Sequence, residues 1–157
     1  MKNSERNRLY RTYNTLYNRH YIEEGYICIY CNSPAETLDH VPPLAWIEPF
    51  GLETLRKSGI PLATVPCCRE CNGYLGDRKL LTVEDRLEYL EKKYHSLFDK
   101  LVRWSDDELE EMGESFQKSI RAQRWREDDL NRKIRAIEQR LVKPWTFPDM
   151  YFFLKAS

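Results

Sequence analysis

Two cysteine pairs form the most informative pattern in this sequence. The first pair lies in Cys28-Ile-Tyr-Cys31 and the second in Cys68-Arg-Glu-Cys71. A two-residue spacer lets a tight turn direct two thiolates at one ion, and four thiolates at about 2.3 Å complete a tetrahedral zinc site. Such a site has no open coordination position, so its zinc is structural. We therefore predict a structural Zn²⁺ bound by these four cysteines, and we expect any catalysis to come from other residues.

A fifth cysteine, Cys67, directly precedes the second pair. It could replace Cys68 as a ligand by pairing with Cys71 across three intervening residues. We favour Cys68, because its spacing to Cys71 matches that of the first pair. Free buried cysteines, or a disulfide, are the alternative interpretations of the whole pattern.

Three residues near the cysteine pairs could carry chemistry. A zinc ion that joins the two pairs would place Asp39 and His40, on the strand after the first pair, opposite Asn72, on the helix after the second. Carboxylate and amide oxygens suit Mg²⁺ or Mn²⁺, whereas an imidazole suits a general base near neutral pH. One base beside one such cation can hydrolyse a phosphodiester. Helix capping by Asn72 and a structural role for His40 remain the alternatives.

At this point the chain resembles the HNH, or His-Me finger (ββα-metal), endonucleases, and within them the recombination endonuclease VII-like group. The resemblance covers about fifty of the 157 residues. It rests on Cys28/Cys31, Asp39-His40 and Cys71-Asn72-Gly-Tyr-Leu75-Gly76. It implies that His40 is the general base, that Asp39 and Asn72 hold a catalytic Mg²⁺ or Mn²⁺, that the substrate is DNA, and that the source is phage or bacterial.

One feature departs from that family pattern. Many HNH proteins carry a second Asn or His shortly before the second cysteine pair, where it helps to fix the active loop. Here the corresponding stretch is Leu62-Ala-Thr-Val-Pro66, and Thr64 is its only polar residue. The departure weakens the assignment to the main HNH subtype more than it weakens the assignment to nuclease chemistry.

Composition excludes several classes of protein. A length of 157 residues fits one domain, or a small module with a helical extension. With 41% hydrophobic and 32% charged residues, and no apolar run of membrane-spanning length, the chain is expected to have no membrane partner. The first six residues lack the apolar core of a signal peptide. We therefore expect a cytoplasmic, unexported protein.

The formal net charge of zero conceals a segregated distribution. Residues 1–20 carry five Lys/Arg against one acid, and residues 115–143 carry nine against four, whereas residues 82–114 carry eleven acids against five bases. The basic segments could neutralise DNA phosphates, or they could be ordinary solvated helix faces. Near the second cysteine pair, Arg69, Arg78 and Lys79 are predicted to hold the substrate strand, with plain surface charge as the alternative.

The predicted fold is α+β: a small zinc-stapled ββα-metal core flanked by an N-terminal helix and a long C-terminal helical region. Residues 1–25 form the helix, from an N-cap at Ser4 to a stop at Gly25. Its arginines and tyrosines could contact nucleic acid, although packing against the zinc module is favoured. Residues 26–80 form the core, with strands over 26–30, 37–41 and 60–66, one or two helical turns between Gly51 and Gly59, and then the helix that carries Asn72.

Residues 81–157 are predicted to be helical, with an aromatic C-terminal tail. Capping boxes at Thr82/Asp85 and Ser105/Glu108 begin two helices, and the second is expected to continue at helical spacing to Leu141. Polar residues Gln123 and Glu127 interrupt its apolar seam. The helices could pair as a hairpin within one chain or exchange across a homodimer. The tail, Trp145 to Phe153, is expected to dock on the domain or on a second subunit, and His20 and His95 are expected to have no catalytic role.

These features favour a metal-dependent endonuclease that hydrolyses DNA phosphodiester bonds. The main alternative is a non-catalytic zinc-stabilised module that binds nucleic acid or protein. A third interpretation is a regulator built on the helices, with zinc serving only stability. No sequence-reading element such as a finger array accompanies the core, which favours structure-directed or weakly specific cutting.

Overall fold

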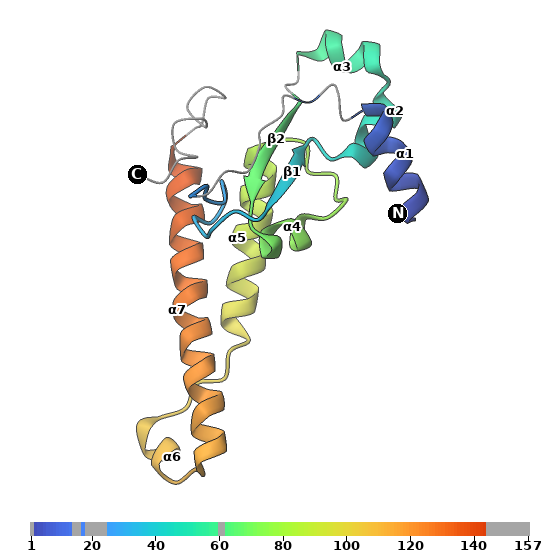
Figure 1. The fold of residues 1–157 in the computed structure, drawn as a ribbon. Helices are drawn as coiled ribbons and strands as arrows, with labels where there is room; N and C mark the ends of the chain where they lie inside the picture. The colour runs from blue at the N-terminus through green and yellow to red at the C-terminus, as the bar shows by residue number, and fades with distance from the viewer. Residues whose placement is uncertain (1, 14–16, 18–24, 60–61, 144–157) are drawn as a thin grey trace.

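The computed structural model describes residues 2–13, 17, 25–59 and 62–143. This part of the chain is mixed α and β, with one two-stranded antiparallel sheet and a larger helical portion, so the α+β class is confirmed. In the view of Figure 1 the sheet lies between a long helical hairpin, α5 (Val83–Asp99) and α7 (Glu114–Val142), and the N-terminal helix α1 (Asn3–Tyr13). The tip of the hairpin extends well away from the sheet.

The sheet pairs β1 (Thr37–Val41) with β2 (Ala63–Cys67). The first strand has the predicted bounds. The second overlaps the predicted range 60–66 and extends one residue beyond it, to Cys67. All five residues of β2 are buried, so this strand forms part of the core. The register sets His40 directly opposite Thr64, the polar residue at which the chain departs from the HNH pattern.

The strand predicted over residues 26–30 is wrong. Residues 26 and 27 form isolated bridges rather than a strand, with Ile27 paired to Pro34, and the chain turns over residues 29–31. The Cys28 amide donates to the Ser33 carbonyl (2.6 Å), and the Asn32 amide donates to the Cys28 carbonyl (3.1 Å). These bonds fold the segment into a knuckle, because the two sulfurs of one pair must face the same point.

The connection between the strands contains the short helical segments η2 (Leu44–Trp46), α2 (Ile47–Phe50) and α3 (Leu52–Ser58). Gly51 and Gly59 bracket α3 with φ values of 68° and 67°, a left-handed backbone that favours glycine. The predicted helical turns between these glycines are therefore confirmed. After β2, the second cysteine pair opens α4 (Arg69–Leu75), with Cys68 as its N-cap.

Helix α1 begins at Asn3, so Ser4 lies inside the helix rather than capping it. The rest of the predicted helix, including His20, falls largely outside the described residues. Leu9 of α1 and Tyr17 are buried in a small cluster with Leu44 and Ile47. The apolar stripe of this segment is therefore a packing surface, as favoured from the sequence.

Both predicted capping boxes are confirmed, at Thr82 for α5 and at Ser105 for α6 (Asp106–Glu110). A continuous helix from Ser105 is wrong, because the chain breaks after α6 and Gly113 precedes α7. Helices α5 and α7 pack closely within one chain, which is the hairpin arrangement. The homodimer, the other possibility, stays a prediction, and the aromatic tail lies outside the described residues.

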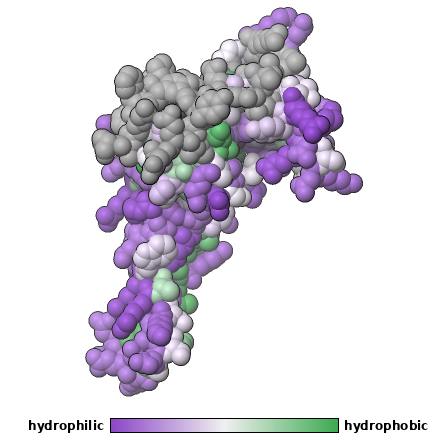
Figure 2. All heavy atoms as spheres, in the orientation of Figure 1, coloured by the Kyte–Doolittle hydropathy of each residue, from purple (hydrophilic) through white to green (hydrophobic). Residues whose placement is uncertain are grey.

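One hydrophobic core joins the predicted nuclease core to the helical region. It includes Tyr30 of the knuckle, Val65 of β2, Leu75 of α4, Leu90 of α5 and Ile137 of α7. The predicted core, residues 26–80, thus shares its interior with α5 and α7 of the predicted helical extension. On the face shown in Figure 2 the hairpin surface is predominantly hydrophilic. Among the described helices none combines the length and apolarity needed to cross a membrane.

Candidate metal centre and catalytic cavity

The four cysteines predicted to bind zinc form one buried cluster. Cys28, Cys31, Cys68 and Cys71 are each at most 5% exposed, and their sulfurs all lie within 4.8 Å of one another. The Cys31 and Cys68 sulfurs are 3.6 Å apart. Tetrahedral geometry with Zn–S bonds of about 2.3 Å requires a separation of about 3.8 Å. The donor set and its spacing therefore fit a structural Zn²⁺.

Cys67 does not belong to this cluster. Its side chain is buried, but its sulfur contacts the Cys68 carbonyl at 3.3 Å, and it is not among the grouped ligands. As the last residue of β2, Cys67 is held in the ladder opposite Thr37. The geometry thus favours Cys68, the ligand preferred from its spacing.

Polar groups surround the sulfurs and can orient them. The Cys71 amide donates to the Cys68 sulfur at 3.4 Å, and the Tyr94 hydroxyl of α5 lies 3.1 Å from the Cys71 sulfur. The Ser33 hydroxyl lies 3.2 Å from the Cys31 sulfur. Donors of this kind stabilise metal-bound thiolates and fix their direction. Burial raises the pKa of the Cys28 thiol, so a bound cation is needed to keep that sulfur ionised.

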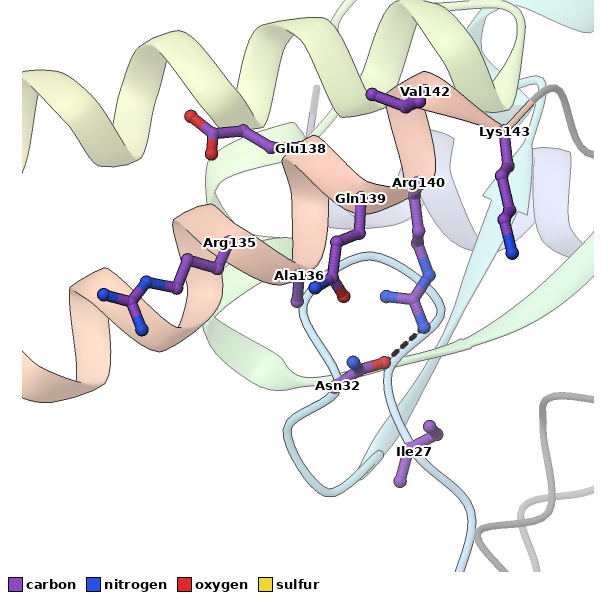
Figure 3. Close-up of a pocket in the computed structure, with 9 residues that line it drawn as sticks. All are labelled: Ile27, Asn32, Arg135, Ala136, Glu138, Gln139, Arg140, Val142 and Lys143. Carbon is purple, nitrogen blue, oxygen red and sulfur yellow. Dashed lines mark hydrogen bonds between the residues drawn. The ribbon is translucent and has the colours of Figure 1, made fainter.

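Two arginines of helix α7 donate hydrogen bonds to the first knuckle, residues 28–33. Arg140 donates to the Tyr30 carbonyl at 2.7 Å. It also donates to the Asn32 side-chain oxygen, as Figure 3 shows. Arg132 donates to the Cys31 carbonyl at 3.3 Å and to the Ser33 hydroxyl at 3.0 Å. A cavity of about 680 Å³ lies beside these contacts, at the C-terminal end of α7. The knuckle is therefore held by the metal ligands and by α7 together.

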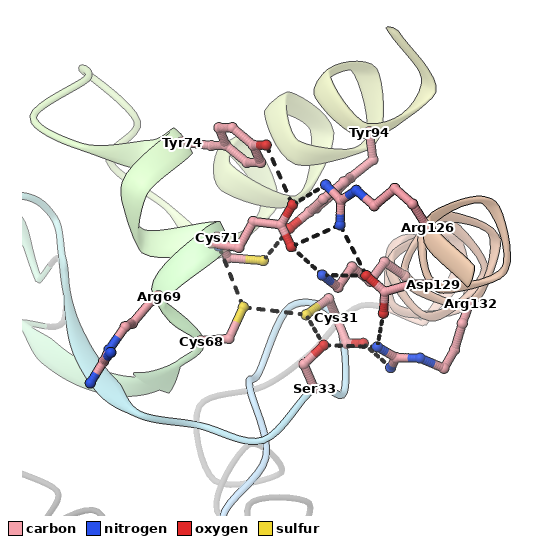
Figure 4. A network of polar contacts seen from close by, with 12 residues as sticks. Cys31, Ser33, Cys68, Arg69, Cys71, Tyr74, Tyr94, Arg126, Asp129 and Arg132 are labelled. Carbon is pink, nitrogen blue, oxygen red and sulfur yellow. Dashed lines mark hydrogen bonds and ion pairs between the residues drawn. The ribbon is translucent and has the colours of Figure 1, made fainter. Parts of the chain in front are cut away.

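A charge network joins the second knuckle to the same helix (Figure 4). Glu70, which precedes the ligand Cys71, pairs with Arg126 and Lys133 of α7. Lys133 also pairs with Asp129 at 2.9 Å, and its side chain is only 6% exposed. This network of ion pairs was not predicted from the sequence. The available signal was the position of Lys133 within the apolar stripe of α7, between Leu130 and Ile134.

Asp39, His40 and Asn72 all line one cavity of about 220 Å³. Three further residues with polar side chains border it: Arg6, Tyr10 and Asp77. The structure thus brings together the three predicted residues, which come from β1 and α4. Asp77, an exposed residue that follows Gly76 in the turn after α4, was not identified from the sequence. Its position directly after the Leu75-Gly76 pair was the available signal.

The His40 ring is flanked by two tyrosines. Tyr10 of α1 and Tyr17 meet it edge-on, with ring centroids 5.7 Å and 4.9 Å away. Burial raises the pKa of Tyr17, so its hydroxyl stays protonated and donates to the Pro42 carbonyl at 2.6 Å. The N-terminal segment therefore supplies one wall beside the imidazole, while the Tyr10 side chain is still 48% exposed.

Asp39 is a buried carboxylate with strong partners. Its Oδ2 atom accepts hydrogen bonds from the Tyr30 hydroxyl and from Arg86 Nη1, both at 2.6 Å. Arg86 also donates to the His40 carbonyl at 2.9 Å and to the Leu80 carbonyl at 3.1 Å. Burial raises the pKa of Asp39, while the positive charge of Arg86 acts in the opposite direction. The hydrogen bonds of Arg86 thus connect α5 to β1, the strand that carries His40.

Asn72 lies inside α4, and its side chain does not cap the helix. Its Nδ2 atom donates to the Thr37 hydroxyl at 3.1 Å, which orients the amide group against β1. With the amide nitrogen used in this way, the amide oxygen is the atom suited to bind a cation. The capping alternative for Asn72 is therefore not supported, because Cys68 occupies the N-cap position.

No family model, curated protein or solved structure matches this chain. The roles of His40, Asp39 and Asn72 therefore have to be argued from their own contacts and chemistry.

The three cations predicted to hold substrate lie outside the residues that border the cavity. Arg78 donates to the Tyr74 carbonyl at 3.1 Å and stacks over Tyr89, and Lys79 lies over the Trp46 ring at 5.2 Å. Arg69 lies 3.9 Å from Glu36. All three are exposed, so substrate contact stays a prediction for them. The cation that does border the cavity is Arg6.

Proposed function

We propose that this chain is a divalent-metal-dependent endonuclease that hydrolyses DNA phosphodiester bonds. The observation that carries the proposal is the shared cavity, which Asp39, His40 and Asn72 all line. Arg6 at the same cavity adds a positive charge that suits a phosphate group. A general base, hard oxygen donors and a phosphate-binding cation are the components that this reaction needs.

His40 would act as the general base. The imidazole takes a proton from a water molecule, and the water oxygen forms a bond to phosphorus as the bond to the 3′ oxygen breaks. The products are a 5′-phosphate and a 3′-hydroxyl, whose oxygen takes a proton from solvent. Tyr10 and Tyr17 limit the orientations of the ring, which keeps the base positioned.

The donor set fits a Mg²⁺-class ion. Asn72 would bind through its amide oxygen, and Asp39 through the oxygen that Arg86 and Tyr30 do not hold. Such an ion would stabilise negative charge on the phosphate and on the departing oxygen. Ligating carboxylates commonly accept hydrogen bonds from outer residues, so the contact with Arg86 is compatible with this role.

Plasmid nicking tests the proposal. The wild-type protein with Mg²⁺ or Mn²⁺ should nick DNA, and excess EDTA should stop the reaction. His40→Ala should reduce the rate by about 10²–10⁴-fold at every metal concentration, because the base is lost. Asn72→Ala should recover partly at high Mn²⁺, because it only weakens ion binding. Lys92→Ala, an exposed change on α5, is the control and should cut like wild type.

The outcome for His40→Ala decides between the two main interpretations. If this variant cuts at the wild-type rate, the mechanism is wrong. DNA binding by a wild-type protein that never cuts would instead favour the non-catalytic zinc-stabilised module.

A further inference from the structure

We propose a second metal site on the helical hairpin, in which Glu91 and His95 of α5 and Glu138 of α7 bind a transition-metal dication of the zinc class. One ligand atom from each side chain lies within 4.8 Å of the other two. These residues belong neither to the four-cysteine cluster nor to the catalytic cavity. The proposal is therefore independent of the proposed nuclease function.

Helical spacing and helix packing bring the three ligands together. Glu91 and His95 are four residues apart on α5, so they occupy adjacent turns of one face. Helix α7 packs against α5, and the Glu138 Oε1 atom lies 3.2 Å from the His95 Nε2 atom. Two rigid elements thus present the ligands, and only side-chain torsions need to change for binding.

The charge balance at this position also points to a cation. Elsewhere between the zinc module and α7, the carboxylates have strong basic partners, as Glu70 has in Arg126 and Lys133. Among the ion pairs of the described residues, Glu138 pairs only with His95, and Glu91 has no lysine or arginine partner. Two converging carboxylates repel each other, and a dication between them would remove that repulsion.

The ligand types define the metal class. An imidazole nitrogen with two carboxylate oxygens suits Zn²⁺, Co²⁺ or Ni²⁺, whereas Mg²⁺ and Ca²⁺ prefer sites made of oxygen alone. His95 and Glu138 side chains are 45% and 46% exposed, so water can complete the coordination sphere. Because the ligands come from both helices, only the folded hairpin presents the full site. Metal binding should therefore stabilise the pairing of α5 with α7.

Titration calorimetry on protein whose four-cysteine site is already filled with zinc tests the proposal. Added Zn²⁺ should bind to wild type with one further equivalent at this site, and His40→Ala should retain that equivalent because the site is distinct from the cavity. His95→Ala should weaken this binding at least tenfold, and Glu91→Gln and Glu138→Gln should each weaken it, because the ligands come from two helices. Glu88→Gln is the matched control, since Glu88 is an exposed carboxylate of α5 outside the cluster. Saturating Zn²⁺ should also raise Tm by about 5 °C in wild type but not in His95→Ala.

Three results would overturn the site. They are the absence of a further equivalent in wild type, an unchanged affinity in His95→Ala, and displacement of Zn²⁺ by equimolar Mg²⁺. Any of them would identify the three side chains as ordinary surface groups.

Discussion

Asp39 has two roles, one in stability and one at the cavity. Its Oδ2 atom neutralises the fully buried Arg86, and the same residue borders the cavity where a cation is proposed to bind. A change at Asp39 therefore alters the fold as well as the chemistry. Asn72, whose amide donates a hydrogen bond to the Thr37 hydroxyl and does not neutralise a buried charge, is the better position for testing ion binding.

Asp39→Ala should lower the free energy of unfolding by about 3–5 kcal/mol, because it leaves the Arg86 guanidinium buried without a counter-charge. Chemical denaturation of the zinc-loaded protein measures this loss. The double variant Asp39→Ala/Arg86→Met should be more stable than the sum of the single changes implies. Asp77→Ala, at an exposed carboxylate on the same cavity, should change stability little. Equal stability of Asp39→Ala and Asp77→Ala would contradict the buried ion pair.

The individual site residues that the sequence predicted are those marked by a local pattern, such as a fixed spacing or an adjacent pair. The cysteine spacing identified the metal cluster, and the Asp39-His40 pair identified the strand that lines the cavity. Arg86 was missed because its partner lies 47 positions away and no local pattern links them. Its place beside Leu87 in the apolar stripe of α5 indicates burial, but it does not indicate which carboxylate accepts its hydrogen bonds.

Helices α5 and α6 differ in how many residues they contribute to the hydrophobic core. Helices α5 and α6 begin with the same type of capping box, yet α5 contributes five buried residues and α6 contributes none. Local sequence predicted both starts. The break before α7 was missed because the apolar spacing of residues 109–120 continues across Gly113.

Thr82→Ala should lower the global free energy of unfolding by about 1 kcal/mol, because it removes the N-cap of a helix that packs in the core. Ser105→Ala removes the matching cap from α6 and should leave global unfolding unchanged, since α6 can open locally. Denaturant unfolding followed by circular dichroism compares the two variants. A global loss of the same size in both would mean that α6 unfolds together with the core.

The contact between α4 and α7 should depend on pH. Burial acts to raise the pKa of Glu70, but hydrogen bonds from Arg126 and Lys133 outweigh it and hold that pKa below its usual value. A carboxyl with a lowered folded-state pKa stabilises the fold fully above its unfolded pKa, about 4.3, and loses that contribution as the pH falls through the folded value.

Glu70→Gln should therefore reduce stability by about 1.5–3 kcal/mol at pH 7. The gap between wild type and variant should shrink below about pH 4. Denaturation of both proteins across this range measures the gap, and acid effects common to both cancel. A gap that stays constant to low pH would show that the charge of Glu70 does not matter.

The cysteine knuckles, the sheet and the helical hairpin share one hydrophobic core, and a smaller cluster packs α1 against η2 and α2. The four cysteines share their core with α5 and α7, and α7 donates hydrogen bonds to carbonyls of the first knuckle. The sequence indicated a cysteine-bound core and a helical region, but it could not show that the two share a hydrophobic core. Apolar periodicity identifies the buried face of a helix and not the surface that it covers.

Removal of zinc should therefore unfold the hairpin as well as the sheet. Excess EDTA, or Cys71→Ser, should abolish the cooperative melting transition and much of the helical signal, and zinc should restore it after EDTA. Cys67→Ser, at a buried cysteine outside the cluster, should retain about one structural zinc. A metal-free protein that melts like wild type would exclude a structural role for the cluster.

Helix α6 lies at the tip of the hairpin, at the end remote from the sheet, and buries none of its residues (Figure 1). A chain opened within α6 would keep the packing between its two fragments, because α5 and α7 are in contact above the tip. The tip is therefore a natural place to split the protein into complementing halves or to insert a reporter domain. Neither change would reach the metal cluster or the cavity beside His40.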